Sequence, residues 1–295
     1  MKKISIIILN YNNYNVTTAC VRYIDDIKSK LFAINIIIVD GCSGDNSCAL
    51  LRKKYKNKKV IGLKQNLGFG GSVNIGIKIA LRDNPDYIMP INNDIVLTKT
   101  ILEALYKLHE KYSKAGVISP VLKYKVGNKT MYNSGTIKNY WGRPIHQISN
   151  KKPLPILFNR YTTPGASIMV KSEIFNRNVF FDKNFFLYFE DDDFCLQIKN
   201  LGYDILVDGN TIVTHGESTT VGWMSKKKFY FVTKSGHIFA DKHIKNRFLN
   251  IFFKTHMFFQ SLWFVITRVK DISYIPCIFL AINDKQKGFL GPRYF

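Results

Sequence analysis

Apolar stretches early in the chain are short and are separated by segments of helical length. Residues 4–9 (ISIIIL) and 34–40 (INIIIVD) are β-branched and apolar at consecutive positions, without polar alternation. Such runs are typical of strands buried on both faces of a parallel sheet. The same reading predicts further strands at 60–63 and 86–91 and helices near 15–30, 73–82 and 99–112. The alternation favours an open, mostly parallel α/β sheet flanked by helices, in the Rossmann-like style.

The pattern changes after the first 115 residues. Residues 116–161 are broken by Gly, Pro and Asn, which indicates hairpins or an irregular insertion. We expect a strand at 165–170, a helix at about 191–201 that ends before Gly202, and two strands at 204–207 and 211–214. These elements predict one domain at about 1–220, built from two halves at about 1–115 and about 116–220.

The charge balance points to a polyanionic neighbour. Among 295 residues, Lys and Arg number 43 and Asp and Glu 21, for a net charge of +22. Nucleic acid, an anionic membrane surface or a phosphorylated substrate would each suit this excess. The five cysteines form no CxxC pair, which favours a reducing compartment over a disulfide or zinc scaffold. The first apolar run is too short for a signal peptide, so we expect it to be a buried strand.

The segment 221–295 forms a separate extension, with thirteen basic and three acidic residues among many phenylalanines. No apolar run there reaches the roughly 18 residues that a membrane-spanning helix needs. Basic residues interleaved with aromatic ones are typical of helices that lie in a bilayer interface. Helices packed on the main domain with a solvated basic face would show the same composition, so both interpretations stay open.

Polar residues repeatedly follow the predicted strands. Because ligands of open α/β sheets bind beyond the carboxyl ends of the strands, these positions predict one crevice. They are Asn10, Tyr11, Asn12, Asp40, Asn66, Gly68, Gly70, Asn92, Asn93, Asp94 and His215. The glycines lie in the turn GFGGS (68–72), which would let a diphosphate approach the backbone closely.

Carboxylates supply the candidate chemistry. Asp94 at a sheet mouth is suited to Mg²⁺ or Mn²⁺, which prefer oxygen ligands and bridge to phosphates, although an Asp here is also a common helix cap. The cluster EDDD (190–193) follows the aromatic run FFLYF (185–189). Acids in a first helical turn complement the helix dipole, but a carboxylate beside apolar walls is also a candidate general base. His215 is a second metal ligand or simply a strand end.

These motifs, in their order along residues 4–218, resemble glycosyltransferase family 2 with the GT-A fold, in the style of the bacterial rhamnosyltransferases of O-antigen or capsule synthesis. They read SIIILNYNN, IIIVDGCSGDNS, NLGFGGSVNIGI, PINNDIVL, GASIMVKSEIF, FFLYFEDDDFCLQIKNLGY and VTHGES. The resemblance implies a metal-dependent, inverting transfer from a nucleotide sugar, dTDP-β-L-rhamnose first, to a polyprenyl-diphosphate-linked saccharide. It also implies a peripheral enzyme on the cytoplasmic face of the bacterial inner membrane, held there by the basic extension.

The resemblance also implies a donor-binding half at about 1–115, an acceptor-binding and catalytic half at about 116–220, and roles for individual residues. The loop Asn10, Tyr11, Asn12 and Asp40 would hold the base and ribose, and Asn66, Gly68, Gly70, Asn92 and Asn93 would line the donor site. Asp94 and His215 would bind Mg²⁺ or Mn²⁺. Asp191 matches the catalytic base, with Glu190 and Asp193 supporting it or the acceptor. The family's DxD reads Asn92-Asn93-Asp94 here, so a single carboxylate remains.

Other functions remain as alternatives at this level. A family 2 enzyme could use UDP-glucose, UDP-galactose or UDP-N-acetylglucosamine, and a non-catalytic member of the family could bind a partner without turnover. A basic nucleic-acid-binding protein would suit the charge, but no helix-turn-helix, zinc finger or RNP signature is present. A nicotinamide-dependent oxidoreductase would need a glycine fingerprint after the first strand, which the sequence lacks.

Overall fold

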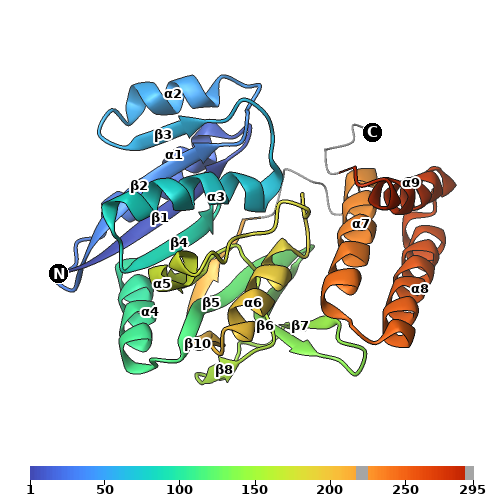
Figure 1. Cartoon of the computed structure of the whole chain (residues 1–295). Helices are drawn as coiled ribbons and strands as arrows, with labels where there is room; N and C mark the ends of the chain where they lie inside the picture. The colour runs from blue at the N-terminus through green and yellow to red at the C-terminus, as the bar shows by residue number, and fades with distance from the viewer. Residues whose placement is uncertain (217–224, 290–295) are drawn as a thin grey trace.

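The structure is a computed structural model that describes residues 1–216 and 225–289. Within these residues ten strands form one sheet, and helices pack on both of its faces (Figure 1). The elements up to the middle of the chain are β1 (Lys2–Asn10), α1 (Tyr14–Asp25), β2 (Phe32–Asp40), α2 (Ser47–Lys54), β3 (Lys59–Gly62), α3 (Gly68–Ala80), β4 (Tyr87–Asn92), α4 (Lys99–Lys111), β5 (Ala115–Val126), β6 (Lys129–Lys138) and β7 (Pro144–Ser149).

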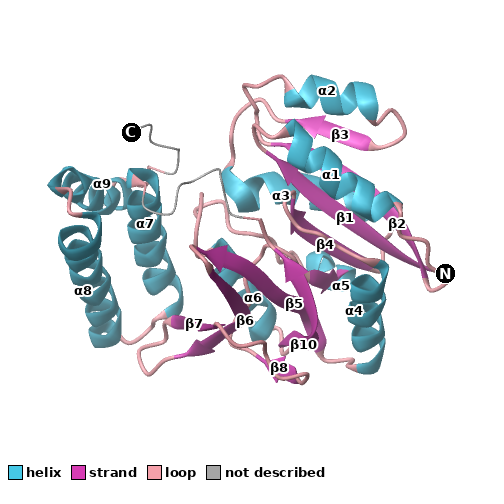
Figure 2. Ribbon diagram, turned by 180° about the vertical axis from the view of Figure 1, so that it is seen from behind, coloured by secondary structure: helices cyan, strands magenta, loops and turns pink. Residues whose placement is uncertain are grey.

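The second part of the chain completes the sheet and adds a group of helices beside it. The elements are β8 (Leu157–Asn159), β9 (Met169–Lys171), α5 (Ser172–Asn176), α6 (Glu190–Asn200), β10 (Asp204–Thr214), α7 (Lys226–His243), α8 (Arg247–Phe264) and α9 (Ile275–Gln286). Seen from behind, α7, α8 and α9 stand together at one side of the sheet, next to the β6–β7 hairpin (Figure 2).

The strand order is β3-β2-β1-β4-β9-β5-β10-β8, with β6 and β7 added beyond β5. Strands β3, β2, β1 and β4 form one group of mutually parallel strands, and β5 and β10 form a second parallel pair. The short strand β9 pairs in antiparallel fashion with both β4 and β5 and so joins the two parallel groups. The expected α/β architecture with a mostly parallel sheet is therefore confirmed.

Strand β1 shows why the apolar runs are continuous. Ile4, Ile6 and Ile8 face a core shared with α1 and α4, while Ile7 faces a second core shared with α3 and α6. All four isoleucines are inaccessible to solvent. A strand covered on both faces needs apolar side chains at consecutive positions, which explains the absence of alternation.

Several element boundaries differ from the sequence-based expectation. The strands expected at 204–207 and 211–214 form one strand, β10, whose register against β5 shifts between Asp208 and Ile212. The strand expected at 165–170 is confined to β9, and helix α2 was not expected at all. Helix α3 begins at Gly68, inside the glycine-rich turn, instead of after it. Each difference involves Gly, Asn or Ser positions, where contacts elsewhere in the fold decide the local backbone.

The C-terminal helices pack on the catalytic half and also expose apolar side chains. Phe239 of α7 and Phe253 and Met257 of α8 form a buried cluster with Phe185. Phe248 and Phe259, in contrast, are 83% and 59% exposed on α8. No helix in the described ranges is long and apolar enough to cross a membrane. The expected domain boundary at 220/221 lies outside the described residues.

Candidate active site

The carboxyl ends of the parallel strands align at one edge of the sheet. In the register of the sheet, Asn10 at the end of β1 pairs with Asp40 at the end of β2, and Leu9 pairs with Asn92 at the end of β4. Gly62, at the end of β3, pairs with Asp40. The sequence-predicted polar positions at these strand ends therefore lie along one edge, as a ligand crevice requires.

Asn10 and Asp40 form a buried network at that edge. The Asn10 amide donates to Asp40 Oδ2 at 2.6 Å and to Ser47 Oγ at 2.9 Å, and its carbonyl accepts from Thr17 Oγ1 at 2.5 Å. Asp40 also accepts from the Ser43 backbone N–H at 2.9 Å. Because both side chains are fully buried and engaged within the protein, they shape the loop after β2. Ser43, Ser47 and Thr17 were not among the predicted site residues.

The loops after β1 and β2 are also joined directly. The Asn12 backbone N–H donates to Ser43 Oγ, and the Asn12 side-chain Oδ1 accepts from the Gly44 N–H, each at 2.8 Å. Asn12 has a φ of 51°, a left-handed backbone that Asn tolerates better than most residues. Tyr11 packs over Gly41, where a Cβ would lie 3.6 Å from the Tyr11 ring. The result is a preformed rim at the ends of β1 and β2.

The glycine-rich turn is clamped to the loop before α6. The Asn66 side-chain Oδ1 accepts from the Gly68 N–H at 2.9 Å, and the Phe69 N–H donates to the Phe186 backbone carbonyl at 3.1 Å. Gly68 has a φ of +73°, and a Cβ there would lie 2.0 Å from the Phe186 carbonyl oxygen. Gly70 likewise packs against Phe181. Glycine is therefore required at 68 for packing within the protein, whether or not a diphosphate approaches this turn.

Asp94, Asn92 and His215 come together at the end of β4. His215 Nε2 lies 2.9 Å from the Asn92 amide nitrogen and 3.4 Å from Asp94 Oδ1. Ile95 forms a β-bridge with His215, which fixes the two segments relative to each other. Burial raises the pKa of Asp94, and the nearby His215 opposes that rise. Asn93 points elsewhere, because its amide donates to Thr17 Oγ1 at 2.8 Å.

The four adjacent acids occupy four different environments. Glu190 and Asp192 are buried, at 8% and 7% exposure, and burial together with the neighbouring Asp191 raises the pKa of each well above its usual range. Asp192 accepts a hydrogen bond from the Thr162 hydroxyl. Burial of this kind shifts a carboxyl group toward its protonated form and removes it from contact with solvent.

Asp193 points away from the sheet edge and anchors α7. Its buried carboxylate accepts from His243 Nε2 at 2.6 Å, from Lys242 Nζ at 2.8 Å and from the Gln197 amide at 2.8 Å. Lys242 also pairs with Asp182 at 2.6 Å. These contacts make Asp193 a support for the helices and leave it no free oxygen for an acceptor substrate.

Asp191 is the acid of the four that is neither buried nor ion-paired with any residue that the structure describes. Its Oδ2 accepts from the Gly165 N–H at 3.0 Å, and its Oδ1 accepts from the Asp192 N–H at 2.9 Å. Two backbone donors hold the carboxylate in one orientation while it stays partly accessible. This combination of fixed position and access suits a general base.

The turn before α6 sets the direction in which Asp191 points. Tyr188 and Phe189 are consecutive non-glycine residues in the left-handed region, with φ values of 65° and 64°. Such residues are strained and persist where surrounding contacts determine them. Here Phe189 packs on Phe239 of α7, and the Ser235 hydroxyl donates to the Leu187 carbonyl at 2.7 Å. The aromatic run 185–189 is therefore the docking surface for α7.

A two-residue stretch connects Asp191 to the Asn92–Asp94–His215 group. Gly165 donates to Asp191, and the next residue, Ala166, accepts from the Asn92 backbone N–H at 2.9 Å. A Cβ on Gly165 would lie 3.2 Å from the Asp191 Cβ and 3.4 Å from the Phe69 ring. The candidate base, the end of β4 and the glycine-rich turn thus border one small region. Gly165 had been expected only as the start of a strand.

The Asp94–His215 pair fits a divalent cation that takes most of its ligands from water and substrate instead of from the protein. Asp94 Oδ1 is buried and accepts no hydrogen bond from the described residues, which leaves one carboxylate oxygen available. The described ranges hold no group of three or more His, Cys, Asp or Glu side chains suited to a metal. Mg²⁺ commonly binds through one or two protein ligands, with water and substrate phosphates completing its octahedron.

Comparison with known proteins agrees with this geometry. Residues 5–175 match the family model described as glycosyl transferase family 2. A Haloferax volcanii protein named low-salt glycan biosynthesis hexosyltransferase Agl10 is 23% identical over 300 residues, covering 96% of this chain and 91% of its own. The N-acetylglucosaminyl-diphospho-decaprenol L-rhamnosyltransferase of Mycobacterium tuberculosis is 21% identical over 238 residues, covering 71% and 76%.

Solved structures share the fold over nearly the whole chain. S. aureus TarS in complex with UDP-GlcNAc superposes with a TM-score of 0.62 at 17% identity, covering 98% of this chain and 82% of that one. GalNAc-T7 with UDP, GalNAc and Mn²⁺ superposes with a TM-score of 0.61 at 14% identity, covering 94% and 58%. Since the family model spans more than half of the sequence and the fold is shared, the chain belongs to glycosyl transferase family 2.

Proposed function

We propose that this glycosyltransferase moves a hexose, most favourably L-rhamnose from dTDP-β-L-rhamnose, to a hydroxyl of a diphosphate-lipid-linked saccharide. The shared border of Asp191 and the Asn92–Asp94–His215 group at Gly165–Ala166 carries the proposal. It places a candidate base and a candidate diphosphate site in one region. The relatives named as a hexosyltransferase and a rhamnosyltransferase support the choice of sugar and acceptor.

The proposed mechanism is a single displacement. Asp191 accepts the proton of the acceptor hydroxyl while that oxygen attacks the anomeric carbon, and the nucleoside diphosphate leaves from the opposite face. One positioned base suffices for this reaction, and the anomeric configuration inverts. A divalent cation, when bound, would neutralise charge that develops on the leaving diphosphate. Asp94 and His215 are the residues that would hold it.

Asn92 orients His215 for such a role. Its amide N–H donates to His215 Nε2 at 2.9 Å, so that nitrogen carries a lone pair and no proton, and a metal ion bound there would replace this hydrogen bond. A carboxylate at position 92 would instead accept a proton from Nε2 and favour the tautomer that cannot bind a metal through this atom. The Asn in place of the family's first Asp is therefore compatible with metal binding.

Membrane contact is the second part of the proposal. Helix α8 has no acidic residue, and Phe248 and Ile251 on it are 83% and 54% accessible. Ile266, in the segment Val265–Val269 that follows α8, is 57% accessible. With a net charge of +22, this surface suits the anionic headgroups of a membrane where lipid-linked acceptors lie. A peripheral position on the cytoplasmic leaflet follows as part of the proposal.

A donor screen tests the proposal. Purified full-length protein is incubated with Mg²⁺ or Mn²⁺ and dTDP-rhamnose, UDP-glucose, UDP-galactose or UDP-N-acetylglucosamine, with and without a lipid-linked N-acetylglucosamine acceptor. We expect acceptor-stimulated release of dTDP and an α-linked product. Preference for UDP-N-acetylglucosamine, which TarS binds, would replace the rhamnose assignment. Absence of transfer from all four donors would reject the proposed reaction.

A further inference from the structure

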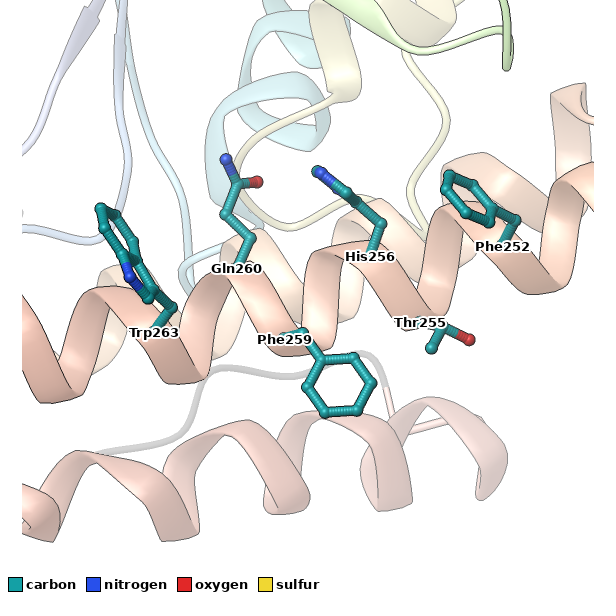
Figure 3. A pocket seen from close by; sticks show the side chains of 6 residues that line it. All are labelled: Phe252, Thr255, His256, Phe259, Gln260 and Trp263. Atoms are coloured by element: carbon teal, nitrogen blue, oxygen red, sulfur yellow. The ribbon is translucent and has the colours of Figure 1, made fainter.

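A cavity outside the catalytic region runs along α8. It has a volume of about 450 Å³, and aromatic side chains dominate its wall. The lining residues are Phe252, Thr255, His256, Phe259, Gln260 and Trp263. In Figure 3, Phe252, His256, Gln260 and Trp263 project from the same side of the helix. Residues three or four positions apart lie on one face of an α-helix. The volume lies in the range of ordinary ligand sites.

Arg143, in the turn between β6 and β7, lies at the polar side of this cavity. Its Nη1 donates to Gln260 Oε1 at 2.9 Å and lies 3.3 Å from His256 Nδ1. Trp141 of the same turn packs on Phe252, with ring centroids 4.5 Å apart. Burial lowers the pKa of Arg143, so its guanidinium is a partly desolvated cation.

No carboxylate in the described ranges lies within ion-pair distance of Arg143. Its recorded side-chain partners are a neutral amide and an imidazole, and the nearby Asp192 acts on its pKa only through space. A half-buried guanidinium usually has an anionic partner, because desolvated charge is costly without one. The described residues around Arg143 therefore supply it with no ion-pair partner, and apolar side chains lie beside it.

The β6–β7 hairpin brings this cation near the acids at the start of α6. Asp192 opposes the lowering of the Arg143 pKa, and Asp191 opposes the lowering of the pKa of His146 on β7. An acceptor sugar whose hydroxyl lies at Asp191 would thus direct the phosphate that links it to its lipid toward Arg143. The aromatic cavity continues from there along α8.

We propose that Arg143, with His256 and Gln260, binds the diphosphate of the acceptor, and that the aromatic cavity on α8 binds the first part of its isoprenoid chain. Charge complementarity and the adjoining apolar space select this occupant, an anionic head joined to an apolar tail. The inference rests on the proposed function, because it deepens the acceptor assignment. A site of this kind would bind one lipid-linked substrate specifically, which differs from contact of α8 with any anionic membrane.

Direct binding tests the site without turnover. Full-length protein is titrated by calorimetry with farnesyl diphosphate, with farnesol and with inorganic pyrophosphate. Because head and tail contribute separately, we expect farnesyl diphosphate to bind at least about tenfold more tightly than either part. Arg143→Gln and Trp263→Ala should each weaken its binding by about tenfold, and Arg143→Lys should weaken it less.

Matched controls separate recognition from folding. Arg177→Gln removes an exposed arginine that stacks on Tyr203, outside the cavity, and should leave binding unchanged. The thermal midpoint of every variant is measured, and Arg143→Lys covers the case in which Arg143→Gln loosens the hairpin. Equal binding of farnesol and farnesyl diphosphate, or no effect of either Arg143 variant, would overturn the inference.

Two outcomes distinguish this inference from the proposed function. Farnesyl diphosphate binding that depends on Arg143, in a protein that transfers no sugar in the donor screen, would support the site and reject the reaction. Transfer to a lipid-linked acceptor at wild-type efficiency by Arg143→Gln would support the reaction and overturn the site. Arg143-dependent binding to phosphatidylglycerol vesicles without farnesyl diphosphate binding would assign Arg143 to membrane headgroups and overturn the inference.

Discussion

Single residues with the same side chain differ in chemistry according to their surroundings. Asp191, Asp192 and Asp193 are adjacent, yet one is held by backbone donors, one is buried beside Thr162 and one is ion-paired with α7. Burial and pairing decide which carboxylate keeps an accessible, charged oxygen. The catalytic base among these adjacent acids can therefore be identified only when the hydrogen-bond and ion-pair partners of each carboxylate are known.

Replacement of Asp191 by Asn tests the base directly. The amide cannot accept the acceptor's proton, so turnover should fall by about 10²- to 10⁴-fold while the donor dissociation constant changes little. Initial rates and donor binding are measured on the same preparation. Asp204→Asn, at the opposite end of the strands, is the control and should retain activity. Retention of substantial turnover by Asp191→Asn would refute the assignment.

Chelation tests the metal role of Asp94 and His215. EDTA should stop transfer, and Mg²⁺ or Mn²⁺ should restore it, because the leaving diphosphate loses its counter-charge without the cation. Asp94→Asn should raise the metal concentration needed for half-maximal activity by at least about tenfold. Full activity in EDTA, or an unchanged metal requirement in the variant, would contradict this role.

Helices take their places through a small number of buried polar contacts as well as through apolar packing. Helix α7 joins α6 through Asp193 and its partners Lys242 and His243, and it also packs on the aromatic run 185–189. Helix α6, which carries Asp191, therefore packs directly against α7, the first helix of the extension. Docking of α7 and placement of Asp191 are coupled because both depend on this turn.

Loss of the buried charge at position 193 should destabilise the whole domain. Asp193→Asn leaves Lys242 and His243 near a neutral amide, which should lower the free energy of unfolding by about 3 kcal/mol. Urea unfolding followed by circular dichroism measures the change. Asp83→Asn breaks an exposed ion pair with Lys59 and should cost less than about 1 kcal/mol. Equal effects of both variants would argue against the anchor.

Helix α4 introduces a pH dependence of stability. His109 is buried, its Nε2 lies 3.0 Å from the Met169 carbonyl, and burial lowers its pKa from 6.5 to about 4. Between those values the unfolded chain binds a proton that the folded chain excludes, so stability falls as the pH decreases. The loss should reach about 3 kcal/mol near pH 4.

Substitution of His109 tests whether its titration causes the predicted loss of stability at low pH. His109→Gln keeps a donor for the Met169 carbonyl and removes the titration, so urea midpoints measured from pH 7 to pH 4 should fall less steeply than in wild type. His237, whose pKa burial also lowers to about 4, accounts for part of the remaining slope. Parallel pH profiles in the two proteins would show that folding does not lower the pKa of His109.

The whole molecule combines a transferase domain with a helical group that is buried on one side and apolar on the other. Phe253 and Met257 of α8 are inaccessible to solvent, whereas Phe248 and Ile266 face outward. Removal of the extension would uncover Phe185 and its neighbours, so deletion would confuse loss of membrane contact with unfolding. Surface substitutions are the better test.

Vesicle binding tests the proposed membrane face. Phe248→Ser combined with Ile266→Ser should reduce co-sedimentation with phosphatidylglycerol vesicles by at least about tenfold, because each side chain no longer enters the interface. Binding of wild type should weaken at high salt. Leu50→Ser, an exposed apolar change on α2, is the control. Unchanged sedimentation of the double variant would contradict the proposed face.

The local pattern of the sequence was sufficient to predict the parallel sheet and the positions of its strand ends. Continuous apolar runs such as residues 4–9 occur where both faces of a strand are covered, and Asn10, Asp40 and Asn92 follow such strands directly. The boundaries of β9, β10 and α3 were predicted poorly. They depend on contacts between distant segments, such as the one between Gly68 and Phe186.

Residue type and order are enough to identify the family, the fold class and the set of acids from which a base could come. Three features emerge only on folding: which acid stays accessible, the contact of Asp193 with α7, and the position of Arg143 next to an aromatic cavity on a helix more than a hundred positions away. Burial, pairing and desolvation are properties of the surroundings that folding creates. No local pattern of residues specifies them.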